Sequence, residues 1–217
     1  MPNGFPAGAG LGWARMKKLI IIQFVAVLAL AGTAQVSVSP QTFDNLNAAF
    51  QGESNAAHRY EACAKKADTE GYVYVARLFR AAAKAETTHR DSHRRVILEL
   101  GGKITDFKLD EVKPGSTAEN LRAAIKGETY ERDKLYPEFM GVQARMDGAK
   151  AALRTFRYSQ KAEAEHAKLF QDALDNLGKN QDLPLHVCKV CGYTVTTLPA
   201  TDCASCREPV SGYESIH

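Results

Sequence analysis

Two Glu-x-x-His pairs lie within long segments of helical periodicity in this 217-residue chain. Glu86 and His89 form one Glu-x-x-His pair, and Glu163 and His166 form another. Residues three apart on a helix point the same way, so each pair offers a carboxylate and an imidazole on one face. Carboxylates can bridge two metal ions while an imidazole binds each ion, so the pairs indicate donors for two irons.

Three further glutamates lie where a helix should be apolar. Glu53 interrupts one apolar stripe, and Glu128 and Glu131 interrupt another. An unpaired carboxylate is unfavourable to bury, so acids on a core face require cations or protons. A solvated Glu-x-x-Glu pair and a metal-free ion-pair network are the alternatives. The order of donors along the chain, Glu, Glu/His, Glu/Glu and Glu/His, matches a di-iron helix bundle and favours the metal site.

Four long segments with helical periodicity position these donors. They cover about residues 42–68, 72–100, 116–146 and 148–177. The third opens with a capping-box pattern at Ser116 and Glu119 and carries its inward stripe on to Val142 and Met146. Residues 101–115 make a connection that is long for adjacent antiparallel helices and fits a crossover along a bundle. We predict an all-α fold, a four-helix bundle with a long crossover.

Four cysteines near the C-terminus stand in two Cys-x-x-Cys pairs separated by eleven residues. The pairs are Cys188 with Cys191 and Cys203 with Cys206. Two such loops can complete a tetrahedral shell of four sulfurs, which accepts iron or zinc. Two disulfides are the alternative in an oxidising compartment. A tail this short cannot fold on apolar burial alone, so a bound metal would supply its stability.

Three other residues on the helical segments have less specific explanations. His93, one turn after His89, is predicted to support a ligand or to pack in the core rather than to bind metal. His58 falls off the inward stripe and should be solvated. Cys63 adjoins the inward face and should behave as a small apolar residue.

Residues 1–34 have the pattern of a cleaved signal peptide. A basic flank of Arg15, Lys17 and Lys18 precedes an apolar run over residues 19–30. An uncleaved membrane anchor is the alternative. Without this segment the chain has 28 − 3 = 25 basic and 25 acidic residues, which gives no basic surface for nucleic acid. We predict a periplasmic or otherwise exported protein.

Taken together, the motifs resemble those of the rubrerythrin family. They include FQGESNAAHRY around Glu53, GETYE with the extra acid Glu131, LYPEF, and CKVCGY at the first cysteine pair. The resemblance implies a ferritin-like di-iron domain over residues 35–179 and a rubredoxin-like domain over residues 180–217.

The same resemblance implies roles for individual side chains. Seven residues would bind the two irons, namely Glu53, Glu86, His89, Glu128, Glu131, Glu163 and His166. Cys188, Cys191, Cys203 and Cys206 would bind a single iron, with zinc as the alternative. Tyr60 and Tyr136 match tyrosines that form hydrogen bonds near the di-iron site.

The resemblance predicts a non-haem di-iron peroxidase that reduces hydrogen peroxide to water, with electrons passed through the sulfur-bound iron from an unknown donor. Glu131 is the acid that tunes such a site toward peroxide. In the family the sulfur-bound iron of one subunit reaches the di-iron site of another, which implies a head-to-tail homodimer. An iron-detoxifying ferroxidase and a non-enzymatic, exported metal-binding bundle with zinc in its tail are the alternatives.

Overall fold

The computed structural model describes residues 38–179 and 182–217 of the chain. The predicted signal peptide, residues 1–34, lies outside the described residues, so its cleavage and the location of the protein stay predictions. Across the described ranges, no helix combines the length and the apolar character that crossing a membrane requires. The domain boundary placed at residue 180 also stays a prediction.

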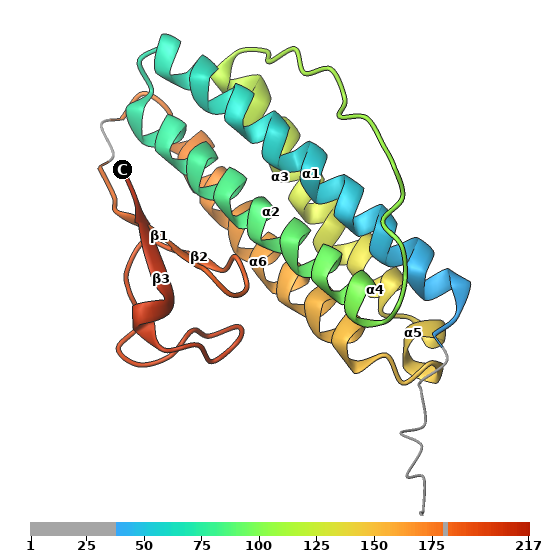
Figure 1. Ribbon diagram of the computed structural model, residues 1–217. Helices are drawn as coiled ribbons and strands as arrows, with labels where there is room; N and C mark the ends of the chain where they lie inside the picture. Colours follow the sequence, from blue (N-terminus) through green and yellow to red (C-terminus); the bar gives the residue numbers. More distant parts are fainter. Residues whose placement is uncertain (1–37, 180–181) are drawn as a thin grey trace, which may run out of the picture. The chain divides into compact units, whose positions relative to one another are not determined.

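Four long helices form the bundle that the periodicity predicts (Figure 1). They are α1 (Pro40–Thr69), α2 (Val73–Glu99), α3 (Thr117–Tyr130) and α6 (Lys150–Asp175). Ser39 caps α1 by accepting a hydrogen bond from the N–H of Thr42, and Pro40 occupies the first turn, where an N–H is not needed. The capping box predicted at Ser116 and Glu119 is present at the start of α3. Local signals therefore determine where these helices begin.

The predicted crossover connects α2 to α3 along the outside of α1 (Figure 1). The side-chain amide of Asn47 donates to the carbonyl of Lys103, and its oxygen accepts from the N–H of Thr105. Two turns further along α1, Asn55 accepts from the N–H of Asp110. These asparagines supply hydrogen bonds to a segment that has no sheet or helix partners of its own.

The third helical segment is not one continuous helix, so the prediction of a single run to residue 146 is wrong. It consists of α3, a π-helical turn η1 (Glu131–Leu135), α4 (Tyr136–Phe139) and α5 (Val142–Met146). Pro137 favours an irregular turn here, because it has no N–H to donate and its ring crowds the carbonyl four residues earlier. In a π-helix its acceptor would be the carbonyl of Arg132, five residues earlier. The side chain of Gln160 on α6 donates to that carbonyl instead, at 2.9 Å.

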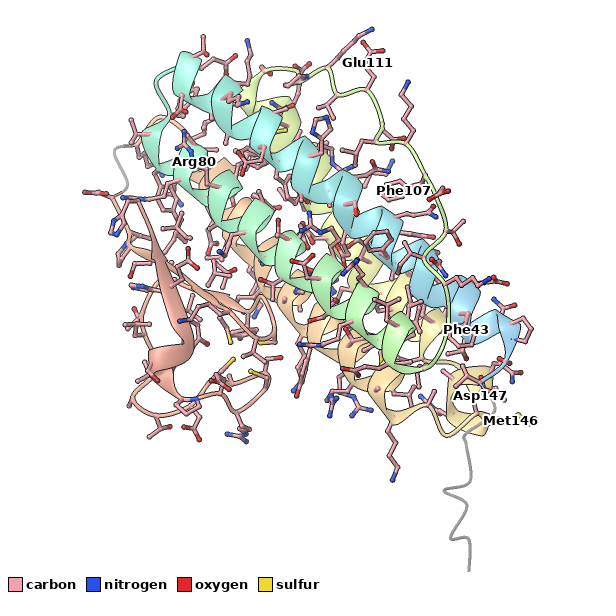
Figure 2. The ribbon with its side chains drawn as sticks, viewed as in Figure 1. Phe43, Arg80, Phe107, Glu111, Met146 and Asp147 are labelled. Atoms are coloured by element: carbon pink, nitrogen blue, oxygen red, sulfur yellow. The ribbon has the colours of Figure 1, made fainter. Side chains whose placement is uncertain are left out.

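The end of this segment also turns away from the core. Val142 and Met146 are 73% and 75% exposed, so their predicted inward positions are wrong. Asp147, directly after α5, accepts hydrogen bonds from the N–H and hydroxyl of Ser39 and from the hydroxyl of Thr42. Figure 2 shows Met146 and Asp147 at the end of the bundle where α1 begins. Residues 142–147 therefore close that end of the bundle.

Two apolar clusters fill the bundle, with a polar layer between them. Along α2, Phe79 belongs to one cluster and Ile97 to the other. Glu86, His89 and His93 lie between these two positions and are at most 2% exposed. Charged groups buried between two apolar layers require compensating charge, which identifies this layer as the place to look for a site.

The tail forms a small antiparallel sheet with the strand order β2-β1-β3. The strands are β1 (Leu185–Cys188), β2 (Thr194–Val195) and β3 (Tyr213–Ile216), with a 3-10 turn η2 (Val210–Gly212) before the last. Leu185 and Val187 of β1 are buried in the same apolar cluster as Phe79. Lys84 of α2 pairs with Glu214 of β3 at 2.9 Å. The predicted fold, a helix bundle followed by a small metal-knuckle unit, is confirmed.

Candidate metal centres

Six of the seven predicted di-iron ligands come together inside the bundle, and all four long helices contribute. They form two groups in which each residue offers a donor atom within 4.8 Å of the others. One group is Glu53, Glu86, His89 and Glu163, and the other is Glu86, Glu128, Glu163 and His166. Glu86 and Glu163 belong to both groups, as carboxylates that bridge two metal ions do.

The two histidines face the shared carboxylates through the same ring nitrogen. His89 Nδ1 lies 2.9 Å from the carboxylate of Glu86 and 3.2 Å from that of Glu163. His166 Nδ1 lies 3.0 Å from Glu163 and 3.5 Å from Glu86. Each group therefore has one imidazole nitrogen directed at the pair of shared acids, which is the donor arrangement of two adjacent metal positions.

Unpaired buried atoms show that these residues fit metal ions. Among the described residues, several donor atoms of the set are buried and have no hydrogen-bond partner: Glu53 Oε2, Glu86 Oε1, Glu128 Oε2, both carboxylate oxygens of Glu163, and His166 Nδ1. Buried polar atoms are almost always paired, so this concentration calls for another partner. The four glutamates of the two groups carry four negative charges when ionised, which two divalent cations balance.

In the protein without bound metal, the glutamates and histidines of the site differ widely in pKa. Burial, followed by the charge of Glu86, raises the pKa of Glu53 well above its usual value and that of Glu128 to about 7. Burial also acts on Glu86, but the nearby imidazoles of His166 and His89 outweigh it and hold its pKa below the usual value. For both histidines burial acts to lower the pKa, but the surrounding carboxylates outweigh burial, and the pKa lies well above the usual value. Metal binding must therefore release protons.

Two buried tyrosines support Glu53 and Glu128, the two outer carboxylates, each of which belongs to only one donor group. They are the tyrosines to which the resemblance assigns this role. The hydroxyl of Tyr60 donates to Glu128, and the hydroxyl of Tyr136 donates to Glu53. Burial and the nearby carboxylates raise the pKa of both tyrosines well above the usual value. Both hydroxyls therefore keep their protons and remain donors.

His93 lies beside this site without belonging to either group of donors. Its Nδ1 lies 3.2 Å from the hydroxyl of Thr155, and its Nε2 lies 3.3 Å from the hydroxyl of Ser159 and 3.4 Å from that of Tyr136. Burial and the charge of His89 lower the pKa of His93 to about 3, so the ring is neutral. The structure places it as a supporting residue, as the sequence predicts.

Glu131 is the one predicted ligand that neither group contains. It is the first residue of the π-helical turn and is half-buried. Burial, followed by the charges of Glu128 and Glu163, raises its pKa well above the usual value, so its carboxyl group lies within the field of the site. Its role as a ligand stays a prediction.

The four cysteines of the tail face one another. Cys188 Sγ lies 3.7 Å from Cys206 Sγ, and Cys191 Sγ lies 3.6 Å from Cys203 Sγ. A tetrahedral shell with metal–sulfur bonds of about 2.3 Å has sulfur–sulfur edges of about 3.8 Å, which these distances match. A disulfide would hold two sulfurs at about 2.0 Å, so the disulfide alternative is wrong. The donor set fits iron or zinc.

The two cysteine loops have the same backbone turn. The N–H of Gly192 donates to the carbonyl of Cys188 at 2.9 Å, and the N–H of Arg207 donates to that of Cys203 at 3.0 Å. Both residues have left-handed backbones, with φ of 72° and 68°. Glycine is the usual residue for this conformation, and the second loop nevertheless accommodates an arginine.

Two residues outside the metal groups have surroundings that also agree with the sequence. His58 is exposed on α1. Cys63 is buried in an apolar cluster, where burial raises the pKa of its thiol to about 11. Neither residue therefore adds a donor to the site.

The first cysteine loop contacts both histidines from outside the bundle. The carbonyl of Cys191 lies 3.0 Å from His89 Nε2, and Thr194 Oγ1 lies 3.0 Å from His166 Nε2. A Cβ on Gly192 would lie 2.3 Å from His89 Nε2, so this approach requires a glycine. Sequence reasoning missed Thr194, because neither periodicity nor metal-ligand spacing marks a threonine in a two-residue strand.

These contacts connect the tail to the bundle of the same chain, beside α2 and α6. The resemblance assigns the corresponding approach to two subunits of a head-to-tail dimer. Here a single chain brings its own four-cysteine site to its own pair of metal positions. The homodimer stays a prediction.

Comparisons with known proteins agree with this geometry. A family model described as Rubrerythrin matches residues 44–174. Rubrerythrin-2 of Clostridium acetobutylicum is 36% identical over 174 residues, which cover 76% of this chain and 91% of that protein. Nigerythrin of Nitratidesulfovibrio vulgaris is 32% identical over 168 residues, which cover 77% of this chain and 83% of that protein.

Solved structures extend the likeness to the tertiary fold. A structure of nigerythrin in its fully reduced, all-ferrous state aligns with a TM-score of 0.73 and 29% identity, over 86% of this chain and 91% of that one. An open-pore ferritin from Archaeoglobus fulgidus aligns with a TM-score of 0.59 and 18% identity, over 67% of this chain and 91% of that one. The ferritin shares the fold of the bundle alone.

Proposed function

This chain belongs to the rubrerythrin family, and on that premise we propose that it is a non-haem di-iron peroxidase that reduces hydrogen peroxide to water. The bundle would hold two irons at Glu53, Glu86, His89, Glu128, Glu163 and His166, and the four tail cysteines would hold a third. When bound, the paired irons would supply the two electrons that peroxide reduction requires, and the sulfur-bound iron would pass on their replacements.

The observation that carries the proposal is the contact between the two centres. Cys191 is a donor of the four-sulfur site, and its carbonyl accepts a hydrogen bond from His89, a donor of the paired site. A bundle that only oxidises or stores iron does not require a second metal centre in contact with one of its own ligands. The contact therefore favours an enzyme that receives electrons through its tail.

The protein positions the acids before any substrate arrives. Tyr60 and Tyr136 hold Glu128 and Glu53 from opposite ends of the polar layer, where each tyrosine belongs to a different apolar cluster. These donors fix the orientation of the outer carboxylates, as supporting hydrogen bonds around metal ligands do. Because the acids are at most 1% exposed, the layer also excludes bulk water.

A route for a small substrate supports the proposal. A cavity of about 290 Å³ lies between α1, the crossover and α3, and Tyr60 forms part of its wall. Arg59, also on the wall, is half-buried and lies 5.4 Å above the ring of Tyr60. This cavity is therefore the side from which a small, uncharged molecule such as hydrogen peroxide would approach Tyr60, the donor to Glu128.

The test compares oxidants and uses Glu131. Iron-loaded protein, reduced without oxygen, is mixed in a stopped-flow instrument with either hydrogen peroxide or oxygen. We expect peroxide to oxidise it faster, and we expect Glu131→Gln to slow the peroxide reaction selectively. Glu138→Gln is the matched control, because Glu138 is an exposed acid seven residues further along the same segment. A wild-type protein that reacts as fast with oxygen would be a ferroxidase, and unchanged peroxide kinetics in Glu131→Gln would remove Glu131 from the mechanism.

We also propose that the protein acts after export, supported by the signal-like pattern of residues 1–34. Its electron donor would then lie in the same compartment. N-terminal sequencing of the secreted protein tests this, since an intact N-terminus would mean that the segment is retained as an anchor.

A further inference from the structure

We propose that Thr194 is a positioning residue that determines which nitrogen of His166 is free to bind metal. Thr194 belongs to the tail, yet its side chain reaches a donor residue of the bundle. The inference rests on the two-metal centre of the proposed function and not on peroxide as the substrate.

The hydrogen-bond directions at Thr194 carry the argument. A threonine hydroxyl has a single proton. That proton is directed at the carbonyl of Gly192, 3.0 Å away, and a carbonyl can only accept. Toward His166 Nε2, also 3.0 Å away, the hydroxyl must therefore act as the acceptor. His166 consequently carries its proton on Nε2.

The position of this proton decides what the ring offers to the site. With Nε2 protonated, the neutral imidazole has its lone pair on Nδ1. His166 Nδ1 is buried, has no hydrogen-bond partner and lies 3.0 Å from the carboxylate of Glu163. The threonine thus keeps the lone pair on the side where the metal position lies, and excludes the tautomer that would place a proton there.

His89 has an equivalent partner from the same loop. The carbonyl of Cys191 can only accept, so it fixes the proton on His89 Nε2 and leaves Nδ1 facing Glu86. A backbone carbonyl performs this function for one histidine and a side chain performs it for the other. The proton on His89 therefore does not depend on a hydroxyl of the loop, whereas the proton on His166 depends on residue 194.

The fold holds Thr194 firmly enough for this role. Thr194 is fully buried and pairs with Val187 in the sheet. Val187 is itself buried in the apolar cluster of the bundle, so the sheet fixes the position of Thr194 relative to α6. Partners of this kind behind metal-binding histidines change metal affinity by roughly 10- to 100-fold when they are removed.

The experiment uses the full-length protein with Co²⁺ as a paramagnetic probe and Fe²⁺ as the titrant, without oxygen. In the wild type we expect two exchange-protected imidazole N–H signals with the large contact shifts of metal-bound histidines, one from His89 and one from His166. Thr194→Val keeps the shape of the side chain and removes the hydroxyl. We expect it to abolish or move one of the two signals, to leave the other unchanged, and to weaken one of the two bundle Fe²⁺ sites by about 10- to 100-fold.

Further variants separate a positioning role from a structural one. Thr194→Ser retains the hydroxyl and should restore both signals and the affinity. Thr194→Ala replaces the valine variant if the latter does not fold, and is expected to give the same loss. The charge-transfer absorption of the Co²⁺-loaded four-cysteine site should be the same in all variants, which shows that the tail is intact.

The outcomes are distinct. If Thr194→Val binds Fe²⁺ like the wild type and keeps both N–H signals, the proposed role of Thr194 is wrong while the two-metal centre stands. If the wild type itself fails to bind two ions in the bundle, the proposed function fails instead.

Discussion

Replacing Gly192 by alanine should push the first cysteine loop away from His89 while leaving the bundle folded. The new Cβ would lie 2.3 Å from His89 Nε2, and ordinary contact begins at 3.4 Å, so the loop must retreat by roughly 3.4 − 2.3 = 1.1 Å. His89 cannot yield, because its ring is held by Glu86 and Glu163 on its other side. A retreat of that size would lengthen the 3.0 Å bond from His89 to Cys191 to about 4.1 Å, beyond hydrogen-bonding distance.

Two terms set the size of the effect. A left-handed backbone at a residue with a Cβ costs about 1–2 kcal/mol. The buried His89 N–H that loses its acceptor adds about 1–3 kcal/mol. Only the second term is specific to the collision. The lost hydrogen bond should lower the free energy of local opening of the tail by this second amount. Amide exchange in residues 185–195 should then be about 5- to 150-fold faster than backbone strain alone would make it.

Hydrogen exchange followed by mass spectrometry measures this, with Gly101→Ala as the matched control. Gly101 has φ of 82°, and no atom lies within 4 Å of the place that a Cβ would occupy, so alanine there produces the strain without the collision. The second cysteine loop contains its own control, since Arg207 at φ 68° shows that such a loop tolerates a side chain. Equal exchange of residues 185–195 in Gly192→Ala and in the wild type would refute the close approach of tail and bundle.

Three further predictions follow from the same structure. Gln160→Leu should lower the free energy of unfolding by about 1 kcal/mol in urea titrations, because the carbonyl of Arg132 loses its donor and Pro137 cannot replace it; an unchanged midpoint would mean that water satisfies the carbonyl. Glu70→Gln should reduce stability at neutral pH and make the loss of stability in acid less steep. The hydrogen bond from the N–H of Thr117, followed by the contact with Lys66, lowers the pKa of Glu70 from 4.5 to about 2. The contribution of Glu70 to stability is therefore fully present above pH 4.5 and is lost as the pH falls toward 2. Parallel unfolding curves for Glu70→Gln and wild type at pH 6 and pH 3 would contradict this. Cys206→Ala should reduce the iron content from about three to about two ions per chain by elemental analysis, with the helix signal in circular dichroism retained; zinc in the wild-type tail would instead remove the proposed electron input.

The six residues that form the two donor groups of the bundle, and the helices that carry them, could be predicted from the sequence alone. Periodicity places Glu53, Glu86 and Glu128 on inward stripes, because a helix returns to the same face every three to four residues whatever surrounds it. Two Cys-x-x-Cys loops likewise predict a four-sulfur site, since the spacing alone brings the thiolates together. The capping box of α3 and the proline at the start of α1 are local signals in the same way.

Other features depend on contacts between distant segments, and these required the folded chain. The π-helical turn over residues 131–135 is completed by Gln160, and residues 142–147 turn outward to bind the start of α1, so periodicity extended the third helix too far. Thr194 acquires its place beside His166 only because β2 pairs with β1 and β1 is buried against α2. A hydrogen bond between residues 28 positions apart leaves no periodic trace in a sequence, because its two partners are brought together by packing rather than by the repeat of a helix or a strand.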